Sequence, residues 1–174
     1  CFFAISFTLS AQKKVLKVVS TQKIEAAQVD AYDLLRDLER FPEWSPFVVE
    51  DPEQKNHVTG EAGEVGSAFH WEGVAEKSKG SQTLAVADGS EYLKMECDIV
   101  KPFKGKPTFE YQITETENGV EIVQTFELRC SGFNYFMMKL FGVKKHITKT
   151  NELGLTRLKA LLEKEKEATL ETKL

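Results

Sequence analysis

The sequence lacks the residue patterns that mark several common classes of protein. It has three cysteines, Cys1, Cys97 and Cys130, which form neither a disulfide framework nor a CxxC or Cys/His cluster of the kind that binds zinc. Its formal net charge is -4, whereas proteins that bind nucleic acids usually present excess positive charge to the phosphates. We therefore expect no metal, no cofactor and no nucleic-acid partner.

Long hydrophobic runs are also missing, since a membrane-spanning helix needs about 20 apolar residues in succession. The most apolar stretch is residues 1–11, which end in the small residues Ser10 and Ala11 like the later part of a secretory signal peptide. We expect this stretch to be a signal remnant without its start, so that the protein is secreted or periplasmic; otherwise it is cytoplasmic. The alternative is that these residues begin the first strand or pack on the domain.

Residues 12–174 are predicted to form a single domain. Apolar residues make up 41% of the chain and charged residues 29%, which is ordinary for a folded protein. Residues 15–26 read as a strand, and the apolar residues of 29–38 recur at the spacing of a short helix. We expect Pro42 to end that helix, and the aromatic and proline residues of 41–47 to form a compact turn.

Apolar and polar side chains alternate through the middle of the chain, which is typical of half-buried antiparallel strands. The predicted strands of this region include 67–74, 82–87, 92–100, 109–114 and 120–128. Asn118-Gly119 is a strong hairpin signal, and the glycine-rich stretch 60–66 predicts turns. Cys97 and Cys130 would lie two strands apart, at about 10 Å, so we expect both to stay reduced.

The period changes to that of a helix in the last segment, where Leu155, Leu158 and Leu162 share one face. Gly154 in this helix predicts a close approach between the helix and the sheet, and the charged tail after Glu163 is expected to fray. The order is a strand, a short helix, six strands and a long helix. It predicts an α+β fold in which the last helix covers one antiparallel sheet.

Four blocks of sequence add to this pattern. They are Ile24-Glu25-Ala26 with residues 41–47 (FPEWSPF), residues 60–67 with Trp71 and Gly73, Lys101-Pro102-Phe103, and Gly154-Leu155 with Leu158-Lys159 and Glu163. In this order they resemble the START-like, Bet v 1-like (SRPBCC) superfamily, specifically its polyketide cyclase/dehydrase and lipid transport branch. The resemblance spans about residues 18–165. It implies a helix-grip fold, with a seven-stranded antiparallel sheet curled around a long C-terminal helix and a cavity for apolar molecules between them.

The alternation also predicts which side chains line such a cavity. The predicted ligand-binding residues are Phe69, Trp71, Leu93, Met95, Phe109, Tyr111, Ile122, Gln124, Phe126, Phe136, Leu140, Leu155 and Leu158. Tyr111 and Gln124 are the polar members, and they bond a ligand oxygen, a water or each other. The set contains no Asp, Glu, His, Lys or Arg for general acid–base catalysis, and His70 should face solvent, so an enzyme would need a loop group such as His57 or His146.

We therefore expect binding or transport of a small hydrophobic ligand, lipid-like or polyketide-like, by a monomer. Two alternatives stay open: an enzyme of cyclase, dehydratase or hydrolase type that uses the same cavity, and a protein-interaction module like the co-chaperone relatives of the fold. Residues 128–151 are rich in aromatic and basic side chains and contain no Asp or Glu. Residues 133–149 are predicted to contact a membrane surface transiently while the ligand passes; alternatively, they form a lid on the core with solvated lysines.

Overall fold

The structure is a computed structural model that describes residues 13–74 and 77–172. The expected signal remnant, residues 1–11, lies outside the described residues. Among the described residues, no helix is both long and apolar enough to cross a membrane.

Seven strands form one antiparallel sheet in the order β1-β7-β6-β5-β4-β3-β2. The strands are β1 (Lys14–Ile24), β2 (Lys55–Thr59), β3 (Ala68–Glu72), β4 (Lys79–Asp88), β5 (Tyr92–Lys101), β6 (Thr108–Thr116) and β7 (Gly119–Cys130). Each strand pairs with its neighbour in sequence, except that β1 pairs with β7 along its whole length. The predicted hairpin is confirmed, because β6 and β7 pair from Thr116 and Gly119 onward.

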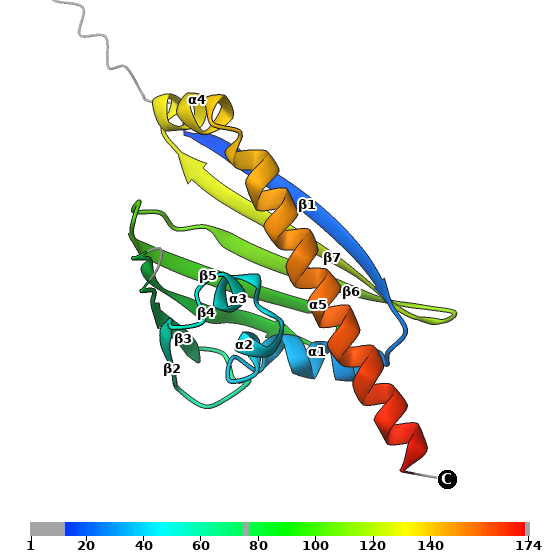
Figure 1. Cartoon of the computed structure of the whole chain (residues 1–174). Coiled ribbons are helices and arrows are strands. Elements are labelled where there is room, and N and C mark those ends of the chain that lie inside the picture. The colour runs from blue at the N-terminus through cyan, green and yellow to red at the C-terminus, as the bar shows by residue number, and fades with distance from the viewer. Residues whose placement is uncertain (1–12, 75–76, 173–174) are drawn as a thin grey trace, which may run out of the picture.

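In the part of the chain that the structure describes, five helices accompany the sheet and lie on its concave side (Figure 1). They are α1 (Gln28–Arg36), α2 (Phe41–Trp44), α3 (Pro46–Glu50), α4 (Gly132–Leu140) and α5 (Val143–Glu171). The long helix α5 crosses the sheet diagonally, α1 to α3 cluster beside its C-terminal half, and α4 lies beyond the end of β7. This is the predicted α+β helix-grip fold.

Three local predictions differ from the structure. Helix α1 ends at Arg36, because Asp37 is extended, and Pro42 stands in the first turn of α2, where its missing N–H costs nothing. The segment 41–47 is therefore two short helices rather than a turn. Helix α5 continues to Glu171 instead of fraying after Glu163, in a stretch rich in the helix formers Glu, Lys, Ala and Leu.

Gly154 does make a close contact, but with α3 rather than with the sheet. A Cβ at this position would lie 3.3 Å from Cδ of Pro46. The short helices α2 and α3, which the FPEWSPF block begins, thus pack directly against α5. Arg157 fastens the same contact, since its guanidinium donates to the backbone oxygens of Trp44 (3.3 Å) and Glu43 (3.0 Å).

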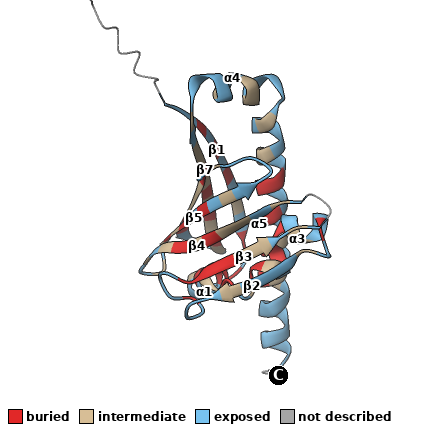
Figure 2. Cartoon of the chain, turned by 90° about the vertical axis from the view of Figure 1, so that its left-hand side faces the viewer, coloured by how far each residue is buried: buried red, intermediate tan, exposed pale blue. Residues whose placement is uncertain are grey.

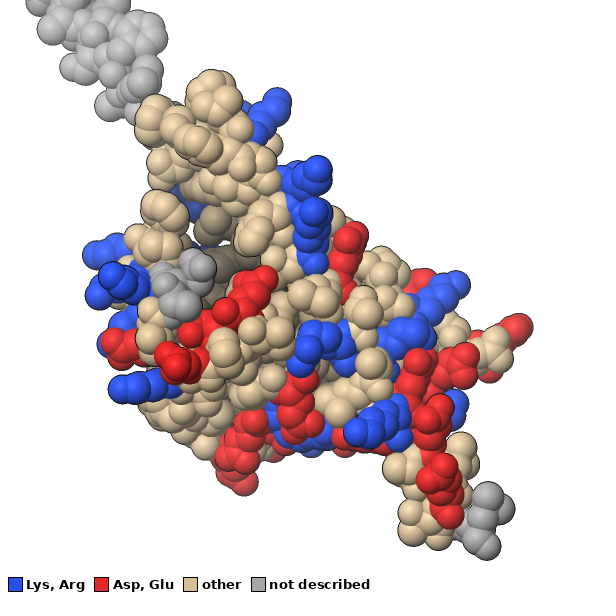
Figure 3. Space-filling view, in the orientation of Figure 1, with Lys and Arg blue, Asp and Glu red and all other residues tan. Residues whose placement is uncertain are grey.

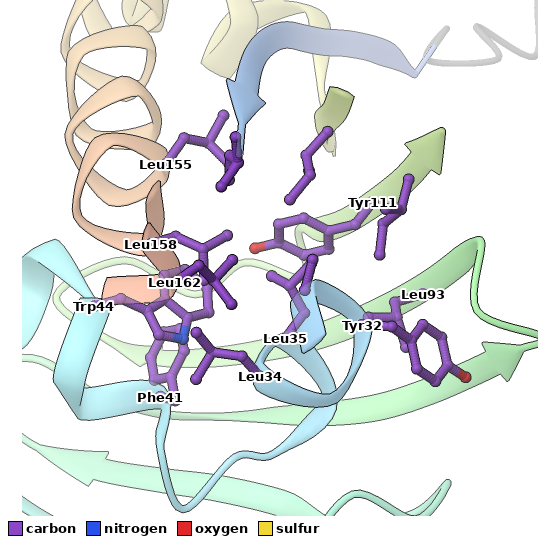
Figure 4. Packing of buried hydrophobic residues seen from close by; sticks show 14 of the residues in the cluster. Tyr32, Leu34, Leu35, Phe41, Trp44, Leu93, Tyr111, Leu155, Leu158 and Leu162 are labelled. Atoms are coloured by element: carbon purple, nitrogen blue, oxygen red, sulfur yellow. The ribbon is translucent and has the colours of Figure 1, made fainter. Parts of the chain in front are cut away.

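The apolar core is divided unequally between the two ends of α5. The main cluster contains 20 buried residues and surrounds α1, α2 and the middle of α5, where Leu155, Leu158 and Leu162 are buried (Figure 4). A second cluster near α4 has three buried residues, Leu16, Val18 and Phe126. Figure 2 shows the same contrast, with buried positions on the middle of α5 and none on α4. The α4 end of the fold is therefore open compared with the α1 end.

Candidate functional site

The structure places the sequence-predicted ligand residues in three different environments. Most of them are buried, and these are Phe69, Leu93, Met95, Tyr111, Ile122, Gln124, Phe126, Leu155 and Leu158. Trp71 and Phe109 are half-buried. Phe136 and Leu140 were expected to face inward, but they expose 61% and 65% of their surface, because α4 stands apart from the sheet as a separate helix.

Within the buried set, close packing removes several side chains from contact with any ligand. Leu93, Ile122 and Leu158 have no exposed surface and fill the main cluster together with the leucines of α1. Figure 4 shows the space between α1, α2 and α5 occupied by their side chains. The lower half of the fold is a filled core.

A small cavity remains at the upper edge of this core, where the sheet, α3 and α5 meet. Phe109, Tyr111 and Gln124 line it from the sheet, and Thr150 and Asn151 line it from α5. Phe41, Trp44, Pro46, Phe47, Gln82 and Gly154 complete its wall. Its volume is about 20 Å³, which accommodates one water-sized group and no larger ligand.

Polar atoms without hydrogen-bond partners border this cavity. The Nε2 of Gln124 donates to the hydroxyl of Tyr111 at 2.9 Å, whereas its Oε1 meets no partner among the described residues. The Nδ2 of Asn151 and the Nε1 of Trp44 likewise have no hydrogen-bond partner among the described residues. Figure 4 shows the Tyr111 hydroxyl pointing from β6 toward α5, between Leu155 and Leu158. Each buried polar group without a hydrogen-bond partner costs the fold about 1 to 3 kcal/mol of stability. Several such groups at one cavity therefore need a physical explanation.

Burial keeps two titratable groups near the cavity, Tyr111 and Cys97, neutral at physiological pH. Burial raises the pKa of the Tyr111 hydroxyl, and the hydrogen bond from Gln124 offsets this in part. Burial also raises the pKa of the Cys97 thiol to about 12, and this thiol makes a weak contact with Oε1 of Gln82 at 3.7 Å. Cys97 and Cys130 are both free thiols, as the sequence predicted.

The three histidines lie elsewhere. His57 and His70 face each other across β2 and β3, with stacked rings whose centroids are 4.8 Å apart. His70 is half-buried there rather than fully solvated, and its Nε2 lies 2.9 Å from the hydroxyl of Thr59. His146 is exposed on α5. Among the described residues that line the cavity, none carries a charge at neutral pH.

Beyond the cavity, an apolar groove continues toward α4. We define it by the half-buried side chains that pack on the second cluster from β6, β7, α4 and α5: Phe109, Leu128, Tyr135, Met138, Val143 and Ile147. Figure 3 shows the surface deeply hollowed beside the first turns of α5. Phe109 belongs to both places, since it lines the cavity and packs against both clusters. The groove and the cavity thus adjoin at Phe109.

Sequence reasoning missed several of these residues. Strand alternation found Phe109, Tyr111 and Gln124, but Trp44, Pro46 and Asn151 come from helices whose docking depends on tertiary contacts. A signal was nevertheless present on α5, where Val143, Ile147, Asn151 and Gly154 continue at three- and four-residue steps into the leucine face.

A larger surface depression lies at the opposite end of the sheet. It has a volume of about 400 Å³ and is lined mostly by charged and polar residues from the end of β1, the β6–β7 hairpin and α5, with Ile24 and Val120 among them. Lys159, one of its walls, is already engaged with the backbone oxygen of Lys23 at 3.1 Å and with the carboxylate of Glu163. Its open, charged character makes it a poor site for an apolar molecule.

Comparison with known proteins identifies a family with which this chain shares its sequence pattern. The family model described as "Polyketide cyclase / dehydrase and lipid transport" matches residues 15–163. The chain belongs to this family. Its members' fold and the family description are consistent with hydrophobic-ligand binding or cyclase-type activity, and they specify neither a ligand nor a reaction for this chain. A search of curated proteins finds no match.

Solved structures agree on the fold alone, because their sequence identities are low. A protein of unknown function from Staphylococcus aureus, SA2116, has a TM-score of 0.68 at 12% identity, covering 90% of this chain and 98% of its own. A Thalictrum flavum norcoclaurine synthase point mutant in complex with a transition-state analogue has a TM-score of 0.67 at 10% identity, with coverages of 89% and 98%. The di-domain ARO/CYC StfQ from the steffimycin biosynthetic pathway scores 0.67 at 13% identity, covering 88% of this chain and 52% of its own.

Proposed function

We propose that this protein, acting as a monomer, binds and carries a small hydrophobic molecule in the apolar groove. The observation that carries the proposal is the incomplete burial of the groove side chains, which converge on a hollow whose inner end is the cavity at Tyr111 and Gln124. Packed cores normally leave few voids of this kind. The ligand that fits is one whose apolar body lies in the groove, because the filled core below admits none.

The size of the groove ligand sets the affinity to be expected. A molecule that buries about 400 Å² of apolar surface gains about 10 kcal/mol. Association costs at least about 4 kcal/mol. The remainder of about 6 kcal/mol corresponds to a dissociation constant of tens of micromolar. Such an affinity suits a carrier that must also release its ligand.

Binding is favoured over catalysis by the chemistry of the cavity wall. The described residues that line it supply hydroxyl, amide and indole groups, and the raised pKa of Tyr111 keeps its hydroxyl protonated at neutral pH. A general acid or base works best when its pKa lies near the operating pH. The chemistry of the cavity wall therefore favours binding of a molecule over proton transfer to or from it.

The proposal is tested by loading and blocking the groove. Val143 is half-buried in the groove, and Val143→Trp should fill it, whereas Val19→Trp places the same ring on an exposed position of β1. We expect native mass spectrometry to show apolar ligand retained by the wild type and by Val19→Trp, and lost from Val143→Trp. Equal retention by the two variants, or no uptake by the wild type from a mixture of fatty alcohols and lipids, would overturn the groove as the site.

We further propose that the ligand is exchanged at an anionic membrane surface, which the α4 end touches. Phe133, Phe136, Leu140 and Phe141 expose between 61% and 73% of their surface there, and Phe103 of the neighbouring β5–β6 loop exposes 82%. Residues 128–151 contain no Asp or Glu. Figure 3 shows this end of the molecule free of the acidic residues that cover the far end. Apolar rings among lysines complement anionic headgroups over acyl chains.

Liposome co-sedimentation separates this membrane contact from the alternatives. Leu140→Ser removes an exposed leucine from α4, and Leu170→Ser removes one that is 54% exposed at the far end of α5. We expect binding to vesicles with anionic lipid at low salt, weakened about threefold or more by Leu140→Ser and unchanged by Leu170→Ser. Absence of lipid-dependent binding would reject the membrane contact and favour a soluble protein as the partner of α4.

A further inference from the structure

The hydrogen-bonding capacity left at the inner end of the groove is fixed by two buried side chains, Tyr111 (2% exposed) and Gln124 (4% exposed). As placed, the amide nitrogen of Gln124 donates to the tyrosine oxygen, which leaves the tyrosine O–H as a free donor and Oε1 as a free acceptor. If the amide is turned over, Tyr111 donates to Oε1, and Nε2 becomes the free donor while the tyrosine oxygen accepts. In both orientations the pair retains at least one free donor and one free acceptor.

A second donor faces the same cavity from the opposite wall. Asn151 is 5% exposed on α5, and its Nδ2 has no partner among the described residues. The cavity measures about 20 Å³, which is the space of one hydroxyl-sized group rather than of a carboxylate or a ring. Phe109 borders both this space and the groove, which places the cavity beside the end of a chain that lies in the groove.

The charge at this position decides between chemical classes of ligand. None of the described residues that line the cavity is a lysine, arginine or histidine. A buried carboxylate without a counter-charge is costly, so an ionised fatty acid is a poor match. A hydroxyl both donates and accepts, as the Tyr111–Gln124 pair requires, whereas an ether or ketone oxygen only accepts.

We infer that the groove selects neutral apolar molecules that end in a hydroxyl group, which Tyr111, Gln124 and Asn151 bind at its inner end. This inference rests on the proposed binding function and narrows it to apolar alcohols. It also gives a role to the buried Tyr111–Gln124 pair on the mostly apolar inner face of the sheet.

Three ligands built on an eight-carbon chain test the inference on the wild-type protein. 1-Octanol can donate and accept, 1-methoxyoctane can only accept, and octanoate is charged at pH 7.5. Titration followed by tryptophan fluorescence is expected to show 1-octanol binding about tenfold more tightly than 1-methoxyoctane, and octanoate more weakly than either. Equal affinities for the alcohol and the ether, or octanoate as the tightest ligand, would overturn the selection of hydroxyl groups while leaving the groove intact. Failure of all three to bind would instead count against the proposed function.

A double variant assigns the selectivity to the named pair. Replacing both partners of a buried hydrogen bond by apolar groups of similar shape is nearly neutral for stability, so Tyr111→Phe/Gln124→Leu is expected to fold. Thr125→Val removes a hydroxyl from the opposite face of β7, next to Gln124 in the sequence but outside the cavity lining, and serves as the matched control. The preference for 1-octanol should fall to about twofold in the double variant and stay near tenfold in Thr125→Val. A preference that survives the double variant would place the hydroxyl site elsewhere, and the wild-type series decides the class of ligand even if the double variant unfolds.

Discussion

At Gly119, at the start of β7, the backbone leaves no room for a side chain. Its φ is +143°, and a Cβ there would lie 2.2 Å from the backbone oxygen of Ile24, at the end of β1. The contact closes the corner where the first strand leaves the sheet beside the β6–β7 hairpin. A side chain at this position must displace backbone, which cannot move as a flexible side chain can.

Replacement of Gly119 by alanine is therefore expected to destabilise the fold by about 2 kcal/mol or more, because it adds backbone strain to a direct clash. Gly132 is the matched control, since a Cβ there meets nothing within 4 Å. Urea unfolding should place the midpoint of Gly119→Ala well below that of the wild type and that of Gly132→Ala close to it. If both variants unfold like the wild type, the corner is less rigid than its geometry implies.

At the residue scale, the sequence identified part of the candidate site. Alternation along β6 and β7 placed Tyr111 and Gln124 on the inner face, because side chains in a strand turn by half a revolution per residue. It also placed Leu93 and Ile122 there correctly, but it could not show that these are packed away in the core. Whether an inward side chain lines a void or fills one depends on what α1 and α2 bring against it. Trp44 and Pro46 reach the cavity only through that docking.

Among the helices, α5 is held at its C-terminal half by a set of polar contacts around Glu163. The carboxylate of Glu163 accepts from the backbone nitrogen of Glu25 at 3.0 Å and from Lys159, whose ammonium also donates to Lys23. One carboxylate thereby fastens α5 to the end of β1. The hydrogen bond from Lys159 lowers the pKa of Glu163, with a further contribution from the Glu25 N–H.

This lowered pKa gives the α5 contact a pH dependence of definite sign. A carboxylate whose pKa is lower in the folded state stabilises the fold above its unfolded pKa, near 4.5, and loses that contribution as the pH falls through the folded value. Glu163→Gln is therefore expected to cost about 1 kcal/mol at pH 7 and progressively less below pH 4.5. Chemical unfolding of both proteins at pH 7 and pH 3.5 measures this. A cost that stays constant or grows toward acid pH would contradict the assignment.

The element boundaries that sequence reasoning missed have a common physical cause. Pro42 was expected to stop a helix, but proline is equally suited to the first turn of one, and only the extended Asp37 decides between the two. The division of residues 132–171 into α4 and α5 depends on Gly142, which has a φ of +66°. Glycine allows that conformation without requiring it, so the sequence alone did not divide the segment.

For the whole molecule, periodicity and the resemblance together were enough for the fold. Strand alternation, one hairpin signal and a single long apolar helix face leave few arrangements other than a sheet wrapped on that helix. The sequence did not show how completely side chains fill the space between the sheet and the helices. The same apolar residues are compatible with an open cavity or a packed core, and the structure has both, with a filled core at the α1 end and an open groove at the α4 end.

This unequal filling predicts that the two ends of α5 differ in local stability. Amides protected by many buried contacts open only with the whole fold, whereas those near small clusters open locally at lower cost. We expect hydrogen exchange to be fast in α4 and in residues 143–149, and slow in residues 155–162. A ligand that binds the folded groove should slow the exchange of the first group by mass action.

The measurement is hydrogen–deuterium exchange with and without 1-octanol, on the wild type and on Val143→Trp. In the wild type, we expect 1-octanol to slow hydrogen exchange only in residues 132–149 and in the facing parts of β6 and β7. In Val143→Trp, we expect no such slowing. The ligand would then complete the smaller cluster that Leu16, Val18 and Phe126 form. Uniform protection along α5 in the free protein would mean that this end is already closed, and the groove would then lack the opening that ligand entry requires.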